Sequence, residues 1–133
     1  MKATARRRDG FTHDVEIEGG HSLVIDEPEA VGGNDLGPSP ARTVAAALAA
    51  CTAITVEMYA DRKGWDLGRI EVDAELVQGP KASLESFTVT LRIPEALDAD
   101  QEQRLLRIAG KCPVHRALSA ETKISIDDRI EAG

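Results

Sequence analysis

The sequence predicts an α+β protein with the element order βββ-α-ββ-α-α-β in a single domain, residues 1–133. Strand-like alternation of apolar and polar residues is confined to three blocks, residues 2–26, 69–93 and 123–128. Helix-like segments lie between these blocks instead of following each strand, an order typical of α+β folds. A chain of 133 residues has the length of one domain, so we expect one core.

Three strands are predicted at the N-terminus. Residues 2–8 form the first strand and residues 11–18 the second, whose alternate residues share one face: Phe11, His13, Val15 and Ile17. The glycine pair at 19–20 tolerates positive φ angles and predicts a tight turn into a third strand, residues 21–26. The loop that follows, residues 27–38, is rich in Gly, Pro and Asp.

A long central helix is predicted over residues 40–63. Ser39 is suited to cap it, Pro40 to begin it and Gly64 to end it. Its first half, VAAALAACTAITV, is apolar on every side, which predicts a helix buried all round. A domain this small cannot cover such a helix alone, so we expect a partner subunit to cover part of it.

The rest of the chain predicts a hairpin, two helices and a last strand. Residues 69–78 and 86–93 alternate and form the hairpin, with these residues facing the core: Ile70, Val72, Ala74, Leu76, Phe87, Val89, Leu91 and Ile93. The second helix covers about residues 98–109 and has an apolar set: Leu105, Leu106, Ile108 and Ala109. Pro113 opens a short third helix, and residues 123–128 close the chain as a strand.

Charge and composition exclude several function classes. The formal net charge is −7 at pH 7, so the chain is unsuited to neutralise phosphates, and we expect no nucleic-acid partner. Residues 1–10 are basic, but the apolar stretch of a secretory signal does not follow. The most apolar segment, Val44 to Val56, is too short to span a bilayer. We therefore expect a cytoplasmic protein with no membrane partner, in a compartment that keeps thiols reduced.

Cys51 lies near the middle of the apolar helix. Burial disfavours its thiolate, because apolar surroundings solvate an anion poorly. From the pattern alone, Cys51 is either an inert core residue or a nucleophile that a nearby cation activates.

Cys112 has a different setting, directly before Pro113, where it is suited to cap the third helix. The backbone N–H groups and the dipole at a helix start favour a thiolate. His115 and Arg116 add positive character within one turn. The residues leave two interpretations open, a reactive thiol or a partly buried structural thiol at a loop corner.

A metal site is the competing use of Cys and His. Cys112 and His115 have two-residue spacing, but a tetrahedral zinc site needs a second ligand pair of similar type. The other candidates, Cys51, His13 and His21, lie in other predicted elements. The loop GGNDLGPSP lacks the Lys-Ser/Thr and the preceding strand of a phosphate-binding loop. We therefore expect no metal and no cofactor.

Three stretches of the chain resemble the OsmC/Ohr family of organic hydroperoxide resistance and osmotically inducible proteins. They are GPSPARTVAAALAACTAITVEMYADRKGW at 37–65, CPVHRALS at 112–119 and ATARRRDG at 3–10. The Pro-led helix with a central cysteine and the second cysteine before a proline are the more specific features. The predicted order of elements agrees with the family over nearly the whole length.

The resemblance implies an OsmC-like fold and an intertwined homodimer whose long helices pack together, with active sites at the subunit interface. It also implies a thiol-dependent peroxidase in oxidative-stress defence. In that reaction Cys51 attacks an organic hydroperoxide, Cys112 converts the resulting sulfenic acid to a disulfide, and an external dithiol reduces the disulfide. Arg8 matches the family arginine that stabilises the first thiolate.

One position departs from the hydroperoxide-resistance members, which carry a glutamate just after the proline that opens the long helix. That glutamate holds the arginine; here Ala41 occupies the position and Arg42 follows. The chain is therefore nearer the OsmC-like subgroup, with Arg42 and His115 as supporting residues. Two other functions stay open: a non-catalytic module that binds a small hydrophobic ligand in the dimer cleft, and a redox or metal sensor.

Overall fold

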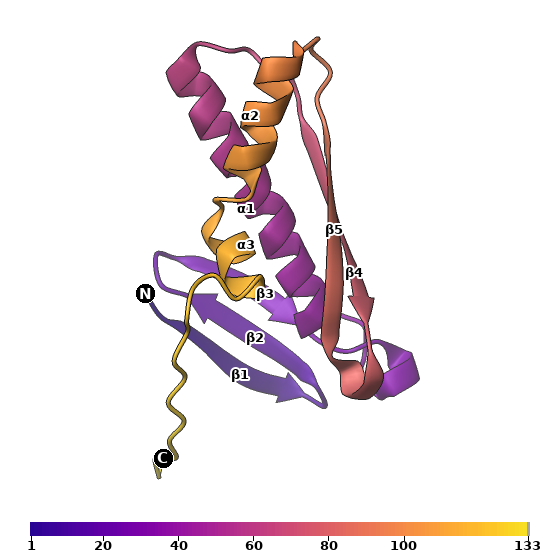
Figure 1. Ribbon diagram of the computed structural model, residues 1–133. Helices are drawn as coiled ribbons and strands as arrows, with labels where there is room; N and C mark the ends of the chain where they lie inside the picture. Colours follow the sequence, from indigo (N-terminus) through magenta and orange to yellow (C-terminus); the bar gives the residue numbers. More distant parts are fainter. Residues whose placement is uncertain (133) are drawn as a thin grey trace. The chain divides into compact units, whose positions relative to one another are not determined.

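The computed structural model describes residues 1–132, and its strands and helices confirm the predicted α+β class (Figure 1). The chain divides into two compact units. One consists of Met1–Ala47 and Ala74–Thr88, and the other of Leu48–Asp73 and the residues from Val89 onward.

The first unit contains a three-stranded antiparallel sheet at the N-terminus. Strands β1 (Ala3–Asp9), β2 (Thr12–Ile17) and β3 (His21–Ile25) lie side by side in that order (Figure 1). Gly19 and Gly20 have φ angles of 105° and 89°, the left-handed conformation that the glycine pair predicts for this turn.

The two faces of this sheet differ in polarity. The register sets Ala5 opposite Val15 and Val15 opposite Leu23, so their side chains share one face. Arg8 pairs with Asp14 on strands β1 and β2, and Nε of Arg8 donates to the carboxylate at 3.1 Å. Phe11 lies in the turn before β2 and is 54% exposed, yet it lines one pocket with His13 and Val15, which agrees with the predicted shared face.

A buried carboxylate holds the loop that follows β3. Asp26 is 1% exposed, and the hydroxyl of Thr12, itself fully buried, donates to it at 2.7 Å. Backbone N–H groups of Glu27, Asn34 and Leu36 donate to its two oxygens at 2.7, 3.3 and 3.2 Å. These four donors lower the pKa of Asp26 from 3.8 to about 2, because each stabilises the charged form. We call this group the Asp26 cluster.

Helix α1 (Pro40–Lys63) follows a 3-10 turn at Glu29–Val31 and has the predicted bounds. The hydroxyl oxygen of Ser39 accepts a hydrogen bond from the N–H of Arg42 at 3.2 Å, which confirms Ser39 as the cap. Gly64 has φ 69° and ends the helix in the left-handed conformation, as predicted.

The predicted burial of α1 on all sides is not reached within one chain. The buried residues follow a four-residue spacing along one side: Leu48, Thr52, Val56 and Ala60. Ile54 and Met58 are 56% and 57% exposed, because a chain of this size supplies core for one side of so long a helix. The segment Val44 to Val56 alone is too short to span a bilayer, but the whole of α1 is long and apolar enough by length and composition to do so. Core helices of soluble proteins meet the same criteria.

The predicted hairpin consists of β4 (Glu71–Gln78) and β5 (Leu84–Arg92), joined through a 3-10 turn at Pro80–Ala82. Its residues alternate between exposed and half-buried along both strands, as the pattern predicts. Near the open end, the guanidinium of Arg92 on β5 pairs with Glu71 and Asp73 on β4.

The second unit holds the largest apolar core of the described residues. It consists of buried residues from α1, the segment after it and α2: Val56, Ala60, Leu67, Leu105 and Ala109. Helix α2 (Ala99–Ala109) begins at Asp98, which forms a reciprocal capping box with Gln101. Leu106, a member of the predicted apolar set, is 58% exposed, since the core side of this helix follows Leu105 and Ala109.

The C-terminal end differs from the prediction. Helix α3 (Pro113–Leu118) is present, but residues 123–128 form no strand. Within residues 1–132 no strand pairs with this segment, and Ile124 and Ile126 are 62% and 81% exposed. Alternation alone does not make a strand, because a strand also needs a neighbour to complete its backbone hydrogen bonds.

Candidate redox site

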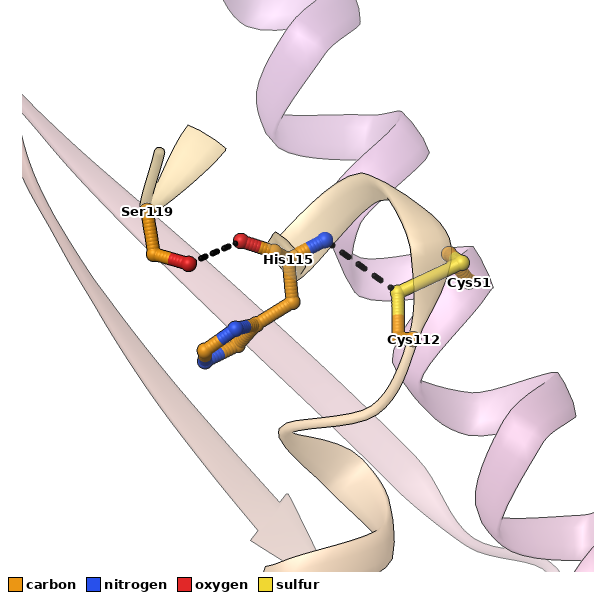
Figure 2. Close-up of a disulfide and its surroundings, with 4 residues drawn as sticks. All are labelled: Cys51, Cys112, His115 and Ser119. Carbon is orange, nitrogen blue, oxygen red and sulfur yellow. Dashed lines mark hydrogen bonds between the residues drawn. A yellow bond between two sulfur atoms is a disulfide. The ribbon is translucent and has the colours of Figure 1, made fainter. Parts of the chain in front are cut away.

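The two cysteines are joined in the second unit. Cys51 lies on α1 and Cys112 is the residue that caps α3, and the structure links them in a disulfide (Figure 2). Their Cα atoms are 5.9 Å apart although 61 positions separate them in the sequence. This separation lies within the usual range for disulfides, so the backbone brings the two sulfurs within bonding reach without displacement.

Cys112 is fully buried at the start of α3. Its Sγ accepts a hydrogen bond from the backbone N–H of His115 at 3.5 Å, so it caps the helix as predicted. Pro113 occupies the first helical position, where its missing N–H costs no hydrogen bond. At the other end, the hydroxyl of Ser119 donates to the carbonyl oxygen of His115 at 2.8 Å and closes this six-residue helix (Figure 2).

Cys51 is only partly buried, in contrast to Cys112. It precedes Thr52, which is on the buried side of α1 with 1% exposure. Of the two cysteines, the one on the long helix is therefore the one that keeps surface open within one chain. Since access governs the reactivity of cysteine as much as charge does, Cys51 is the better placed of the two to meet a substrate.

Two polar atoms in this unit are buried without a hydrogen-bond partner among the described residues, Thr52 Oγ1 and His115 Nδ1. Each belongs to a residue within three positions of one cysteine. Figure 2 shows the His115 ring pointing away from the disulfide, so only its backbone N–H contacts sulfur. Unpartnered buried polar atoms are uncommon, and their occurrence near the disulfide distinguishes this region from the Asp26 cluster.

Thr52 is a residue that the sequence reasoning did not single out. A signal for it was present, because a hydroxyl interrupts an otherwise apolar stripe at positions 48, 52, 56 and 60 of a helix. The signal could not be recognised in the sequence, because the first half of α1 is apolar on all sides and the pattern does not show which side is buried.

The predicted arginines belong to the first unit. Arg8 is 46% exposed at its side chain and forms an ion pair with Asp14, whose pKa this pairing lowers. Arg42 is exposed and its backbone N–H bonds to Ser39 at the start of α1. The roles of Arg8 and Arg42 toward Cys51 stay predictions.

Over residues 1–132, no three side chains of His, Cys, Asp or Glu are arranged to hold a metal ion.

Comparison with known proteins gives one family. Residues 32–127 match the family model described as OsmC-like protein. This stretch includes both cysteines and the whole of α1, β4, β5, α2 and α3. No curated protein matches the chain.

Solved structures with the same fold come from several bacteria. A Psychrobacter arcticus 273-4 protein, named for osmotic stress induction and a detoxification response, is 15% identical with a TM-score of 0.81, and the match covers 88% of this chain and 87% of that one. An organic hydroperoxide resistance protein OsmC of Legionella pneumophila is 21% identical with a TM-score of 0.61, covering 89% of both chains. The organic hydroperoxide resistance protein OhrB of Bacillus subtilis is 25% identical with a TM-score of 0.60, covering 87% of both chains.

Proposed function

This protein belongs to the OsmC-like family, and from that membership we propose that it reduces organic hydroperoxides through Cys51 and Cys112. The observation that carries the proposal is the pairing of an accessible cysteine with a buried one. Two structural relatives are by name organic hydroperoxide resistance proteins, which supports the substrate class.

The proposed cycle begins with the Cys51 thiolate. It attacks one oxygen of the hydroperoxide, the O–O bond breaks, and the other oxygen takes up a proton and leaves as an alcohol. Cys51 is now a sulfenic acid. The thiol of Cys112 attacks its sulfur, a disulfide forms and water leaves. An external dithiol returns both residues to the reduced state, and its own two thiols become a disulfide. No cofactor or metal takes part.

Arg8 is proposed to stabilise the Cys51 thiolate by its positive charge. Its ion pair with Asp14 takes the place of the glutamate that relatives carry where Ala41 stands, and the exposure of this pair makes it a loose anchor. Arg42 and His115 are supporting residues in this proposal. We place the cycle in the cytoplasm, where reducing thiols are abundant.

A homodimer is the proposed native unit. Its support is the apolar side of α1 that one chain leaves open, marked by Ile54 and Met58. Sedimentation at low micromolar concentration should show twice the mass of one chain, and Met58→Lys should shift the protein toward monomer. A folded wild-type monomer would contradict the dimer.

Thiol counting tests the enzymatic reaction directly. Reduced protein should lose two free thiols per chain when it meets one equivalent of an organic hydroperoxide, and a dithiol should restore both. Hydrogen peroxide in equal amount serves as the matched oxidant control for substrate class. Unchanged thiols after the organic hydroperoxide would rule out the reaction.

A further inference from the structure

We propose that the reducing thiol attacks Cys51 Sγ and that Cys112 leaves as the thiolate, so that both half-reactions take place on a single sulfur atom. This inference rests on the proposed function, because it concerns the return of the same disulfide to the reduced state. It assigns the two sulfurs different roles in reduction, and three observations carry it.

The first observation is access. Cys112 has no exposed surface, whereas Cys51 keeps part of its surface open. Thiol–disulfide exchange needs direct contact between the incoming sulfur and the sulfur that it attacks. Within one chain, a thiol from outside therefore meets Cys51 before Cys112.

The second observation is the direction of approach. An incoming thiolate approaches along the S–S axis, from the side opposite the sulfur that leaves. For attack on Cys112, this region lies behind Cys112 Sγ as seen from Cys51. Figure 2 shows that the backbone N–H of His115, in the first turn of α3, contacts Cys112 Sγ from the side away from Cys51. The first turn of α3 therefore lies on the side from which a thiol would attack Cys112.

The third observation is the stabilisation of the leaving group. The N–H of His115 donates to Cys112 Sγ at 3.5 Å, and among the described residues no hydrogen bond ends on Cys51 Sγ. A donor already in place stabilises the negative charge that forms on Cys112 as the S–S bond breaks. A sulfur with a better-stabilised anion leaves faster, so this contact directs the exchange toward Cys51.

The exchange balances in two steps. A thiolate of the dithiol bonds to Cys51 Sγ, the Cys51–Cys112 bond breaks, and Cys112 leaves with the electron pair and takes up a proton. The second thiol of the dithiol, as its thiolate, then attacks the dithiol's own sulfur in the mixed disulfide. The dithiol leaves as a disulfide and Cys51 is released as a thiolate, the form that attacks the next hydroperoxide.

Adduct mapping on the wild-type protein tests the direction of exchange. The disulfide is formed with diamide, so that no peroxide reaction is needed, and the oxidised protein is then mixed with excess 2-mercaptoethanol. Samples taken at early times are quenched in acid and treated with N-ethylmaleimide under denaturing conditions. Peptide mass spectrometry should find 2-mercaptoethanol on Cys51 and maleimide on Cys112 at least tenfold more often than the reverse. An equal distribution, or an excess of adduct on Cys112, overturns the proposal.

A matched pair of variants separates the solvent access of each thiol from its intrinsic reactivity. Cys51 in the Cys112→Ser protein should react with a chromogenic aromatic disulfide at least tenfold faster than Cys112 in the Cys51→Ser protein. In guanidinium chloride the two rates should become similar. Equal rates in the folded variants would contradict the proposal.

The two proposals fail in different ways. If no thiols are lost with organic hydroperoxide but the adduct maps to Cys51, the peroxidase function is wrong and the direction of exchange holds. If hydroperoxide oxidises both thiols but the adduct maps to Cys112, only the direction of exchange is wrong.

Discussion

The Asp26 cluster and the disulfide region are both buried centres, yet their hydrogen bonding is opposite. Asp26 receives four donors, so its carboxylate is satisfied and the loop after β3 is held firmly. Near the disulfide, Thr52 Oγ1 and His115 Nδ1 have no partner among the described residues, and one of the two sulfurs is partly open. A buried group whose hydrogen bonds are all formed, such as Asp26, contributes stability. A site with unpartnered polar atoms and a reversible covalent bond is suited to chemistry.

The largest expected effect is the loss of peroxide consumption in the disulfide region. Cys51→Ser should lower consumption of an organic hydroperoxide to the rate without protein, because no sulfenic acid can form. Cys112→Ser should still consume one equivalent and then stop, with Cys51 as a sulfenic acid or a higher oxide. A sulfenic-acid trap read by mass spectrometry checks both. If Cys112→Ser blocks the first oxidation and Cys51→Ser does not, the roles are reversed.

The next effect concerns stability in the Asp26 cluster. Asp26→Asn should lower the melting temperature by roughly 5–10 °C, since an amide nitrogen would face buried backbone donors. Asp14→Asn is the matched control, because it removes an exposed ion pair and should shift melting by no more than about 2 °C. Thermal unfolding followed by circular dichroism measures both. Equal shifts would mean that the cluster has no special role in stability.

The same cluster predicts the direction of a pH effect. The pKa of Asp26 is about 2 in the folded protein against an ordinary value of 3.8, so its stabilisation is complete above pH 3.8 and is lost as the pH falls toward 2. The stability difference between wild type and Asp26→Asn should therefore shrink between pH 5 and pH 2 in urea unfolding. A constant difference across this range would show that the charge of Asp26 is not what stabilises the loop.

A smaller effect is expected from Arg8 and Arg42, which lie in the first unit and which our proposal assigns to Cys51. In Cys112→Ser, the rate of Cys51 alkylation should rise with pH, and Arg8→Ala should move the midpoint of this rise upward by less than about one pH unit, because Arg8 is loosely held. Arg42→Ala tests the supporting arginine and should move the midpoint less than Arg8→Ala does. If Arg42→Ala moves the midpoint and Arg8→Ala does not, Arg42 is the activating residue.

The smallest effect is expected from Thr52→Val. The change keeps the shape of the side chain and removes a buried hydroxyl that has no partner among the described residues, so stability should stay the same or rise by up to about 1 kcal/mol. Urea unfolding measures it, with Thr12→Val as the contrast, since Thr12 donates to Asp26 and its loss should be destabilising. A loss of stability in Thr52→Val would show that its hydroxyl has a bound partner.

Most of the secondary structure could be predicted, because its causes are local. The cap at Ser39, the stop at Gly64 and the turn at Gly19 and Gly20 depend on residues within about four positions of each other. The strand expected at 123–128 was wrong because pairing with another strand is not a local property.

The candidate site could be predicted only in part. Cys51 and Cys112 were identified from helix position, the proline after Cys112 and family resemblance, and the cap at Cys112 was correct. Thr52 was not identified, because a helix that is apolar on every side does not reveal which side faces the core.

The sequence by itself determined the bounds of α1, the end of α2 and the start of α3. It also determined which residues alternate along the strands, and that one cysteine lies mid-helix and the other at a helix start. Tertiary structure alone decided that two cysteines 61 positions apart form a disulfide, and that Cys112 is buried while Cys51 stays partly exposed. It also decided that Asp26 accepts hydrogen bonds from β2 and from the loop after β3. The physical reason is range: capping and periodicity act over a few residues, whereas access and long-range contact depend on how the whole chain packs.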